Sequence, residues 1–513
     1  MVNSKKILSN TLMLTISSLV MRSIGMAFQV YLTNSISASG VGLFGLIMSV
    51  YTLFTTLAVS GIRFATTRLV SEELGISPTG KIAKIVRTCL GYSLFFGTIS
   101  TVLLLITAKP IGLMWIKDHR SILSLRMISS SLPFLAMSAV LSGYYTAVGR
   151  VHKSAVSQLL EQLTRIFVVV FMFSLFGSND IEYSCAIIMF GGALGDVVSF
   201  SLQYIMYIYD RRKYNTPRTS TKLAERTIRI AFPLALSAYC RTALSTLQQL
   251  LVPVGFQKAG YTQEKALSEY GMVHGMVLPV LTFPSALYYS FSEIIVPVLT
   301  EAQVCNNQVK INSIVNKTLH ISALIAFVLS AMFFRYSNEI GILFYGIDDV
   351  GRYIRILSLL MPIMYLDSIT DGLLRGLGEH LYNMWVNIAD SVISVIFVYV
   401  LLPKWAIYAY LFIICFTELF NFSLSIFRLS KLTDIKINFV SLTVAVFSAV
   451  ASVEITMLVL RTTGLPLAPN TLSIIIHIIF TLTIYMLLIT LFKCVERTDI
   501  DLIKGIFAKK SFK

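Results

Sequence analysis

The sequence predicts an all-α polytopic membrane protein with about fourteen transmembrane helices. The chain has 513 residues, of which 56% are hydrophobic and only 13% are charged, and its mean hydropathy is +0.76. A soluble domain would carry about 25% charged residues. Apolar segments of about 20 residues, the length that crosses a bilayer, recur along the whole chain. The net charge of +16 comes from lysines and arginines that lie mostly in short loops beside these segments, which is typical of membrane topology rather than of nucleic-acid binding.

The predicted spans follow one another with short connections. Their approximate bounds are 11–33, 41–60, 85–107, 122–148, 156–177, 183–208, 228–255, 271–299, 315–334, 354–375, 382–402, 405–427, 438–460 and 471–493. Gly61 and Arg63 interrupt the end of the second span, and only Pro403-Lys404 separates the eleventh from the twelfth. The first span is too long for a signal-peptide core and has no A-x-A site, so we expect it to be uncleaved.

The basic residues predict the orientation of these spans. With both termini in the cytoplasm, the cytoplasmic segments carry 28 lysines and arginines and the outer segments carry 11, while Arg22, Arg165 and Arg241 lie within the membrane. Short cytoplasmic loops are enriched in positive charge. The bias therefore predicts a multi-pass protein of the plasma membrane with both termini cytoplasmic.

The longest hydrophilic connection, 210–226, is basic and follows the sixth span. We therefore predict an N-lobe of six spans over 1–209, this cytoplasmic linker, a C-lobe of six spans over 227–430, and two further spans with a basic tail over 431–513. The six cysteines include no C-x-x-C pair and lie in or near spans. They predict neither a metal site nor a disulfide framework.

Weak self-similarity relates the two sides of the linker. At one constant offset in residue number the aligned pairs are Gly42 and Gly271, Glu72 and Glu301, Pro133 and Pro362, Gly143 and Gly372, Gly149 and Gly378, and Glu161 and Asp390. At a slightly shorter offset, Arg22 aligns with Arg241 and Gln29 with Gln248. Because an even number of spans separates these pairs, we expect two six-helix lobes related by a pseudo-twofold along the membrane normal, with a cavity between them. The last two C-terminal helices lie outside the repeat.

Arg22 lies in the middle of the first predicted span. An arginine there costs roughly 2.5–3.5 kcal/mol on insertion scales, so it should face protein or water. Steps of three or four residues place on one helical stripe Thr11, Thr15, Ser18, Arg22, Gly25, Gln29 and Thr33. Such a stripe favours a helix that lines a cavity. The alternative is that Arg22 pairs with a buried carboxylate and holds helices together.

The seventh span repeats this pattern at Ser237, Arg241, Ser245 and Gln248. Arg22 and Arg241 are therefore expected to approach one cavity from opposite lobes, joined by Arg63 from the cytoplasmic end of the second span. The planar, permanently charged guanidinium suits phosphate, so we predict an anion, with diphosphate as the natural candidate. The predicted substrate-binding residues are Ser18, Arg22, Gln29, Arg63, Ser237, Arg241 and Gln248.

Carboxylates at membrane depth are candidates for a coupling ion. Glu161 lies one turn before Arg165, which favours a local ion pair over substrate contact. Asp367, Asp371 and Arg375 repeat that spacing on the tenth span, and either bind a cation or proton or pair with one another. The ion-coupling candidates are Glu161, Asp367, Asp371 and Asp390. The sequence does not choose among the further carboxylates Asp196, Glu293, Glu418 and Glu454.

The sequence contains no G-x-x-x-x-G-K-[ST] motif and no catalytic constellation. We therefore expect a transporter driven by an ion or by the membrane potential, without a cofactor, rather than an ATP-driven pump or an enzyme. The run Gly191-Gly192-Ala193-Leu194-Gly195 in the sixth span predicts close helix packing.

Two regions resemble a known family. They contain the runs 60–63 (SGIR), 68–72 (RLVSE), 270–279 (YGMVHGMVLP), 283–287 (FPSAL) and 296–302 (VPVLTEA). These runs resemble the stage V sporulation protein B group of the multidrug/oligosaccharidyl-lipid/polysaccharide exporter superfamily, which includes lipid II flippases, O-antigen flippases and multidrug antiporters. The resemblance extends over essentially the whole chain.

The resemblance implies a fourteen-helix, two-lobe transporter that works by alternating access in a bacterial plasma membrane. It implies that a polyprenyl-diphosphate-linked saccharide moves from the inner to the outer leaflet, for peptidoglycan or polysaccharide biosynthesis. The chain is similar to lipid II flippases in placing arginines on spans one, two and seven, here Arg22, Arg63 and Arg241. Two added C-terminal spans contribute in those flippases to a lateral groove for the lipid tail. No residue distinguishes a peptidoglycan precursor from another glycan, and a role in sporulation comes only from the family name.

The expected partners are the lipid-linked saccharide, membrane lipid and a coupling cation, Na⁺ or H⁺, or else the membrane potential. The main alternative is a cation-coupled multidrug exporter on the same fold, which would carry acidic and aromatic residues in its cavity. A scaffold that recruits cell-wall enzymes without transport is a third hypothesis. It would leave Arg22 and Arg241 open to variation without loss of function.

Overall fold

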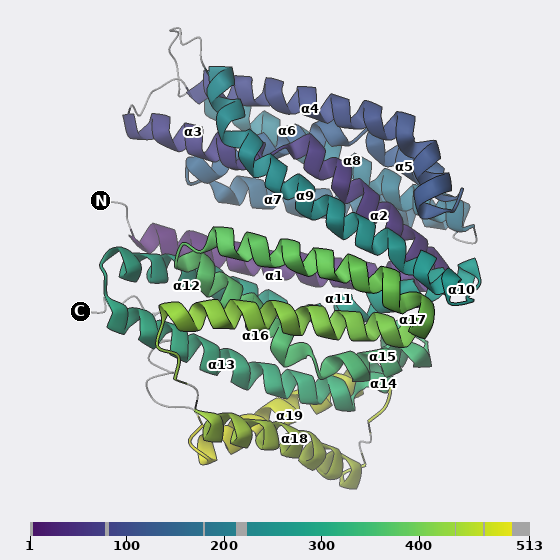
Figure 1. Cartoon of the computed structure of the whole chain (residues 1–513), viewed down its shortest axis with the longest axis vertical. Coiled ribbons are helices and arrows are strands. Elements are labelled where there is room, and N and C mark those ends of the chain that lie inside the picture. The colour runs from purple at the N-terminus through teal and green to yellow at the C-terminus, as the bar shows by residue number, and fades with distance from the viewer. Residues whose placement is uncertain are drawn as a thin grey trace. The chain divides into compact units, whose positions relative to one another are not determined.

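The computed structural model describes residues 4–76, 82–177, 180–211, 223–436, 438–464 and 467–494, and all regular elements in these ranges are helical (Figure 1). The chain divides into two compact units, Met1–Gly271 and Met272–Lys513. We call them the N-terminal unit and the C-terminal unit. The predicted all-helical class is confirmed.

The N-terminal unit is built from ten α-helices and one π-helical segment in the part that the structure describes. They are α1 (Ser4–Ser35), α2 (Ala38–Val59), α3 (Ile62–Ile76), α4 (Ile82–Pro110), η1 (Ile111–Ile116), α5 (Ser121–Ser129), α6 (Leu132–Ala147), α7 (Val151–Phe176), α8 (Ile181–Arg211), α9 (Leu223–Lys258) and α10 (Gln263–Tyr270). Helix α9, assigned to the C-lobe from the repeat, packs here on α2, α3 and α4. The lobe boundaries at 209 and 227 stay a prediction.

The C-terminal unit continues from η2 (Gly271–Val277), which follows α10 directly. Its helices are α11 (Leu278–Thr282), α12 (Ser285–Val304), α13 (Gln308–Arg335), α14 (Ser337–Tyr345), α15 (Asp348–Ser358), α16 (Met361–Gly376), α17 (His380–Leu432), α18 (Phe439–Thr462) and α19 (Thr471–Leu491). Helices α18 and α19 pack on each other and against α13. They correspond to the last two predicted spans.

All fourteen predicted apolar segments fall on helices, but fewer helices pass as spans by length and composition alone. Eight described helices qualify, and ten if each of two bent pairs counts as one span. Helix α17 accounts for two predicted spans by itself. It is interrupted at Ala406, where φ is 45° and ψ is −123°, close to the predicted break at Pro403-Lys404. Its two arms lie side by side (Figure 1). A hydrogen bond joins them, from the Tyr382 hydroxyl to the Leu424 carbonyl at 2.9 Å.

The repeat found in the sequence recurs in the packing inside each unit. The α5–α6 pair bends by 47° and the α15–α16 pair by 57°, at positions related by the same offset as Pro133 and Pro362. That offset also relates two hydrogen bonds that support these bends. Thr101 Oγ1 donates to the Ser129 carbonyl at 2.9 Å, and Ser330 Oγ donates to the Ser358 carbonyl at 2.8 Å. Each unit thus contains the same bent-helix motif.

Glycines allow the closest approaches between helices. A Cβ atom on Gly191 would lie 2.7 Å from Val169 Cγ2, and one on Gly195 would lie 2.9 Å from the Glu161 carbonyl oxygen. Real Cβ atoms do not approach other atoms this closely, so α7 and α8 can pack at this distance only because these positions are glycine. The predicted close packing of the sixth span is confirmed.

Candidate functional site

The break between α2 and α3 forms a junction with α9. Gly61 has a φ of +69°, a conformation that favours glycine. A Cβ atom on Gly61 would lie 2.6 Å from the Ala231 carbonyl oxygen, so the backbone of α9 packs directly on the break. We call the contact of Val59–Ile62 with α9 the α2–α3 junction. It explains physically why the second predicted span is interrupted at Gly61.

Hydroxyl groups connect the elements at this junction. Tyr239 of α9 donates to Ser60 Oγ at 2.6 Å, and the same Oγ lies 3.0 Å from the Tyr92 hydroxyl of α4. About one turn earlier on α2, Thr56 Oγ1 lies 3.3 Å from Thr242 Oγ1. The polar contacts fix α2, α4 and α9 relative to one another.

Arg63 and Arg241 lie on two helices, α3 and α9, that are in contact. Arg63 lies in the first turn of α3, and Arg241 follows Tyr239 by two residues on α9. Both arginines are exposed. Among the residues that the structure describes, neither forms an ion pair with a carboxylate. The structure therefore places two of the predicted arginines on neighbouring helices, α3 and α9, and each lacks a carboxylate partner among the described residues.

Arg22 lies on α1, whose neighbouring residues pack on α7. Gln162 Nε2 donates to the Met21 carbonyl at 3.2 Å, and a Cβ atom on Gly25 would lie 3.1 Å from the same nitrogen. The Arg22 side chain is exposed. All three predicted arginines belong to the N-terminal unit, and their convergence on one cavity stays a prediction.

The other predicted substrate contacts lie on the same two helices. Gln29 of α1 and Gln248 of α9 are half-buried. The side chains of Ser18 and Ser237 fall outside the described part of the structure. Glu293, one of the further carboxylates, also has no described side chain.

Glu161 and Arg165 pair as their spacing predicts. Arg165 Nη2 lies 3.6 Å from Glu161 Oε1, one turn apart on α7. The same helix packs against α8, where Asp196 is buried and accepts a hydrogen bond from the Tyr51 hydroxyl at 3.0 Å. The Tyr51 hydroxyl also lies 3.2 Å from Ser131 Oγ. Sequence reasoning named Asp196 but missed its partners, because they lie far away in the chain and have no pattern of their own.

The carboxylates of the C-terminal unit gather on α16 and α17. Asp367 is only 8% exposed, and its Oδ1 atom accepts no hydrogen bond from the described residues. The charges of Asp371, Asp390 and Glu418 act on it. Asp371 Oδ1 accepts a long hydrogen bond from Ser425 at 3.4 Å. Arg375 forms no direct ion pair in the described part of the chain, but its positive charge acts on Asp371. Ion binding by this group and pairing of Asp371 with Arg375 therefore both stay predictions. No cluster in the described residues has the spacing of a metal site.

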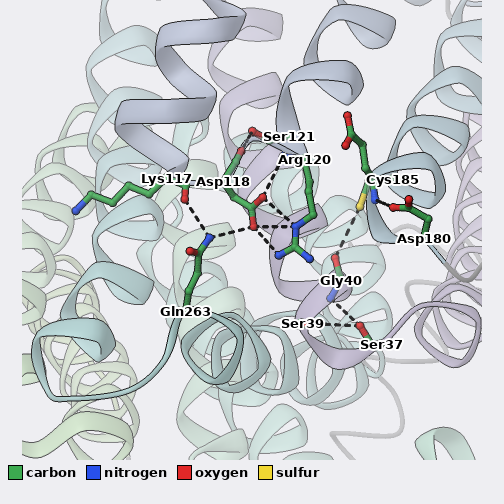
Figure 2. Close-up of polar contacts among 11 residues, drawn as sticks. Ser37, Ser39, Gly40, Lys117, Asp118, Arg120, Ser121, Asp180, Cys185 and Gln263 are labelled. Atoms are coloured by element: carbon green, nitrogen blue, oxygen red, sulfur yellow. Dashed lines mark hydrogen bonds and ion pairs between the residues drawn. The ribbon is translucent and has the colours of Figure 1, made fainter.

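A second polar cluster lies at the end of η1 and was not predicted. Asp118 is only 3% exposed and accepts hydrogen bonds from Arg120 Nε at 2.9 Å and from Gln263 Nε2 at 3.1 Å (Figure 2). Gln263 also donates to the Lys117 carbonyl at 3.0 Å. Burial alone would raise the pKa of Asp118, but the hydrogen bonds and charge of Arg120 outweigh it and lower this pKa. The hydrogen bonds of Gln263 therefore connect the first turn of α10 to the segment between η1 and α5.

Comparison with protein-family profiles identifies the family of this chain. The profile of the family described as polysaccharide biosynthesis protein matches residues 7–303. The chain belongs to this family. A second family profile, MatE, matches residues 259–400 of the same chain. Both matches fit a transporter rather than an enzyme.

Curated relatives agree with this assignment. The family member is 24% identical over 380 residues to stage V sporulation protein B of Bacillus subtilis, covering 72% of this chain and 73% of that protein. It is 22% identical over 344 residues to the lipid II flippase MurJ of the same organism, covering 62% of each chain. The predicted resemblance to the stage V sporulation protein B group is confirmed.

Solved structures show the same fold. A lipid II flippase MurJ in an inward closed conformation aligns with a TM-score of 0.69 at 14% identity, covering 96% of this chain and 100% of the other. An inward-facing multidrug resistance MATE family transporter of the MOP superfamily aligns with a TM-score of 0.63 at 14% identity, covering 82% and 98%. The family member is thus a multi-pass membrane transporter with the fold shared by MurJ and MATE proteins.

Proposed function

We propose that this transporter is a flippase that moves a polyprenyl-diphosphate-linked saccharide across a bacterial plasma membrane by alternating access. In this proposal fourteen spans form two six-helix lobes about a pseudo-twofold axis, with two added helices and both termini in the cytoplasm. The substrate head group occupies the cavity between the lobes while the prenyl tail stays in lipid. Similarity to stage V sporulation protein B and to MurJ supports the substrate class.

The observation that carries the proposal is the state of Arg63 and Arg241. Both side chains are exposed, on the neighbouring helices α3 and α9, and have no carboxylate partner among the described residues. Arg241 lies within a predicted span, and an arginine at membrane depth is retained where it meets water, a counter-charge or a substrate. Guanidinium groups suit an anion with several phosphate oxygens, and in this proposal Arg63 and Arg241 both contact the diphosphate.

The remaining predicted residues have secondary roles in this proposal. Arg22 supplies a third cationic group from α1. Gln29 and Gln248, half-buried on α1 and α9, offer amide groups to sugar hydroxyls. On the stripes predicted from the sequence, Ser18 precedes Arg22 by one turn and Ser237 precedes Arg241 by one turn.

Asp367 leads the proposed ion-coupling residues. A buried carboxylate with an unsatisfied oxygen is costly in its charged form, and binding a proton or a Na⁺ ion removes that cost. Asp371 and Asp390 lie within electrostatic reach of Asp367 and complete the proposed site. Glu161 is already paired with Arg165, so it would act only by releasing that arginine.

Transport by the purified protein in proteoliposomes tests the proposal. Fluorescent lipid II and a second polyprenyl-diphosphate saccharide are placed in both leaflets, and exposure to an impermeant quencher measures translocation. We expect translocation of at least one of these lipids above protein-free vesicles. Absence of translocation for both, under an ion gradient and a membrane potential, would contradict the flippase.

The cation-coupled multidrug exporter is the second candidate. The acidic group on α16 and α17 and the MatE match over residues 259–400 favour it. An exporter would lower accumulation of a cationic dye in cells and would not move the lipid-linked saccharides. The flippase hypothesis predicts the opposite result in both assays.

A further inference from the structure

An apolar groove lies within the N-terminal unit, between α2, η1 and α9. Its volume is about 470 Å³, within the range of about 300–1,000 Å³ typical of ligand sites. Its lining includes Leu53 of α2, Trp115 and Lys117 at the end of η1, and Ala243, Thr246 and Val254 of α9. Thr246 donates its hydroxyl to the Ser49 carbonyl at 3.0 Å, so the surface offered to a ligand is apolar apart from Lys117.

The groove has the length of one membrane leaflet. Its wall on α9 runs from Ala243 to Val254, which at 1.5 Å per residue is about 16 Å. Half of a hydrocarbon core of about 30 Å is about 15 Å. The first residue of α2, Ala38, and the last residue of α9, Lys258, lie at the same end of this helix pair. Leu53 on α2 and Ala243 on α9 each lie about four turns from that end, so they form the inner end of the groove. The groove therefore runs from mid-membrane to one surface.

Lys117 lies at the surface end of the groove. It caps η1 with a φ of 61°, and its carbonyl accepts the hydrogen bond from Gln263. Its side chain extends away from Asp118, which is already paired with Arg120 (Figure 2). No carboxylate among the described residues forms an ion pair with this ammonium. Trp115, two residues earlier, is 50% exposed, as is typical of aromatic side chains at the membrane interface.

We propose that this groove binds one acyl chain of an anionic phospholipid, whose phosphate pairs with Lys117. The predicted topology places the lipid in the outer leaflet. The length of the groove matches a chain confined to one leaflet, and a single ammonium complements a single phosphate diester. The groove shares no residue with the three arginines proposed for diphosphate or with α18 and α19, the spans expected to hold the prenyl tail.

Photo-cross-linking tests the proposal on the full chain. The protein is reconstituted in phosphatidylcholine vesicles that contain phosphatidylglycerol with a diazirine in the middle of one acyl chain. Peptide mapping then locates the adducts. We expect adducts between residues 243 and 254 of α9. Ala243→Trp should fill the groove and remove these adducts while adducts elsewhere remain.

Lys117→Gln tests the phosphate contact. One lysine near a membrane surface contributes about 1 kcal/mol to binding an anionic lipid, so half-maximal labelling should need about fivefold more probe. Lys109→Gln is the matched control, since Lys109 lies in the last turn of α4 and outside the groove. Each variant should unfold at the same temperature as the wild type, which verifies that it is folded.

Three results would overturn the proposal. The first is labelling of the groove by the probe at wild-type strength in both Ala243→Trp and Lys117→Gln. The second is an equal loss in Lys109→Gln. The third is stronger competition by a polyprenyl phosphate than by unlabelled phosphatidylglycerol, which would assign the groove to the transported lipid. Because the assay measures binding, its result is independent of whether the protein flips a saccharide.

Discussion

Charged side chains in this chain take two kinds of position. Asp118 and Arg120 are paired within one short connection, and Glu161 and Arg165 are paired within one turn of a helix. Arg241, in contrast, is exposed within a predicted span and has no carboxylate partner in the described residues. Local pairs satisfy charge and stabilise structure. Unpaired arginines at membrane depth are explained better by a ligand.

Asp118→Asn should destabilise the N-terminal unit. The substitution keeps the size of the side chain but removes the charge that holds Arg120 and Gln263. Hydrogen bonds to a charged group contribute about 2 kcal/mol, so the thermal unfolding temperature should fall measurably. Asp434→Asn is the control, because the Asp434–Lys436 pair is mostly exposed and such pairs contribute at most about 1 kcal/mol. Equal unfolding temperatures for the two variants would refute the structural role of Asp118.

The effect of Asp118→Asn on stability should depend on pH. Burial alone would raise the pKa of Asp118, but Arg120 lowers it below the ordinary value of 3.8. A lowered pKa in the folded state gives stability that is present above 3.8 and lost as pH falls through the folded value. The difference in unfolding temperature between wild type and Asp118→Asn should stay constant from about pH 8 to 5 and shrink below about pH 4. A difference that grows in acid would contradict this sign.

Asp367→Asn should uncouple transport from its driving ion. The amide cannot carry the charge that a proton or Na⁺ neutralises, so an imposed gradient should no longer accelerate translocation. Asp348→Asn is the control, since Asp348 is exposed in the first turn of α15. Initial rates in proteoliposomes, with and without each gradient, measure the effect. Unchanged stimulation in Asp367→Asn would exclude this residue from coupling.

The residues of the candidate site were predictable to different degrees. Arg63 and Arg241 could be named because charge inside an apolar segment is conspicuous in sequence. The Tyr51–Asp196–Ser131 contact could not be found, because tyrosine and serine are common in spans and the pairing is set by packing. Asp118 was missed because a carboxylate in a loop between spans looks like an ordinary solvent-exposed residue. One of its hydrogen-bond donors, Gln263, is distant in sequence.

At the scale of helices, glycine sets how closely neighbours pack. A Cβ atom on Gly97 of α4 would lie 2.7 Å from Pro133 Cα in α6, whereas one on Gly91 of the same helix meets nothing within 4 Å. Gly97→Ala should therefore force the helices apart and cost about 1–3 kcal/mol. Gly91→Ala should be neutral or stabilising by up to about 1 kcal/mol. Thermal unfolding of the two variants in detergent measures the contrast, and a similar loss in both would refute the packing argument.

Apolar segments located the helices because each must satisfy its backbone hydrogen bonds internally within lipid. The sequence was less informative about where helices bend. The α5–α6 bend near Ser130 has no glycine at the break, and its angle of 47° is accompanied by a hydrogen bond from Thr101 of α4, which is distant in sequence. Helix α3 was also missed, because it is short and amphipathic and follows the interruption at Gly61.

At the scale of the molecule, the repeat is the feature that links sequence to fold. A constant offset in residue number predicted two related halves, and the same bend and hydrogen bond recur in each unit. Alignment with MurJ over 96% of the chain extends the agreement to the whole fold. The orientation of the halves about an axis, and the cavity between them, remain predictions from the repeat.

Cysteine labelling tests the predicted topology. Cys305 is exposed in the connection between α12 and α13, which we predict to be cytoplasmic. A membrane-impermeant maleimide should not label it in intact cells, but should do so after permeabilisation. In a variant without native cysteines, Lys265→Cys on the predicted outer side should react in intact cells. The reverse pattern would invert the topology and with it the assignment of leaflets.

The central claim is that arginines hold the diphosphate of a lipid-linked saccharide. Translocation of fluorescent lipid II by Arg22→Ala and Arg241→Ala variants tests it most directly, with Arg229→Ala as the control because Arg229 is 80% exposed and paired with Glu225 on the same helix as Arg241. A charge-assisted hydrogen-bond pair contributes about 1.5–3 kcal/mol, so we predict that each of the first two variants loses about tenfold to a hundredfold in rate at normal expression. Wild-type translocation by both Arg22→Ala and Arg241→Ala would contradict the account.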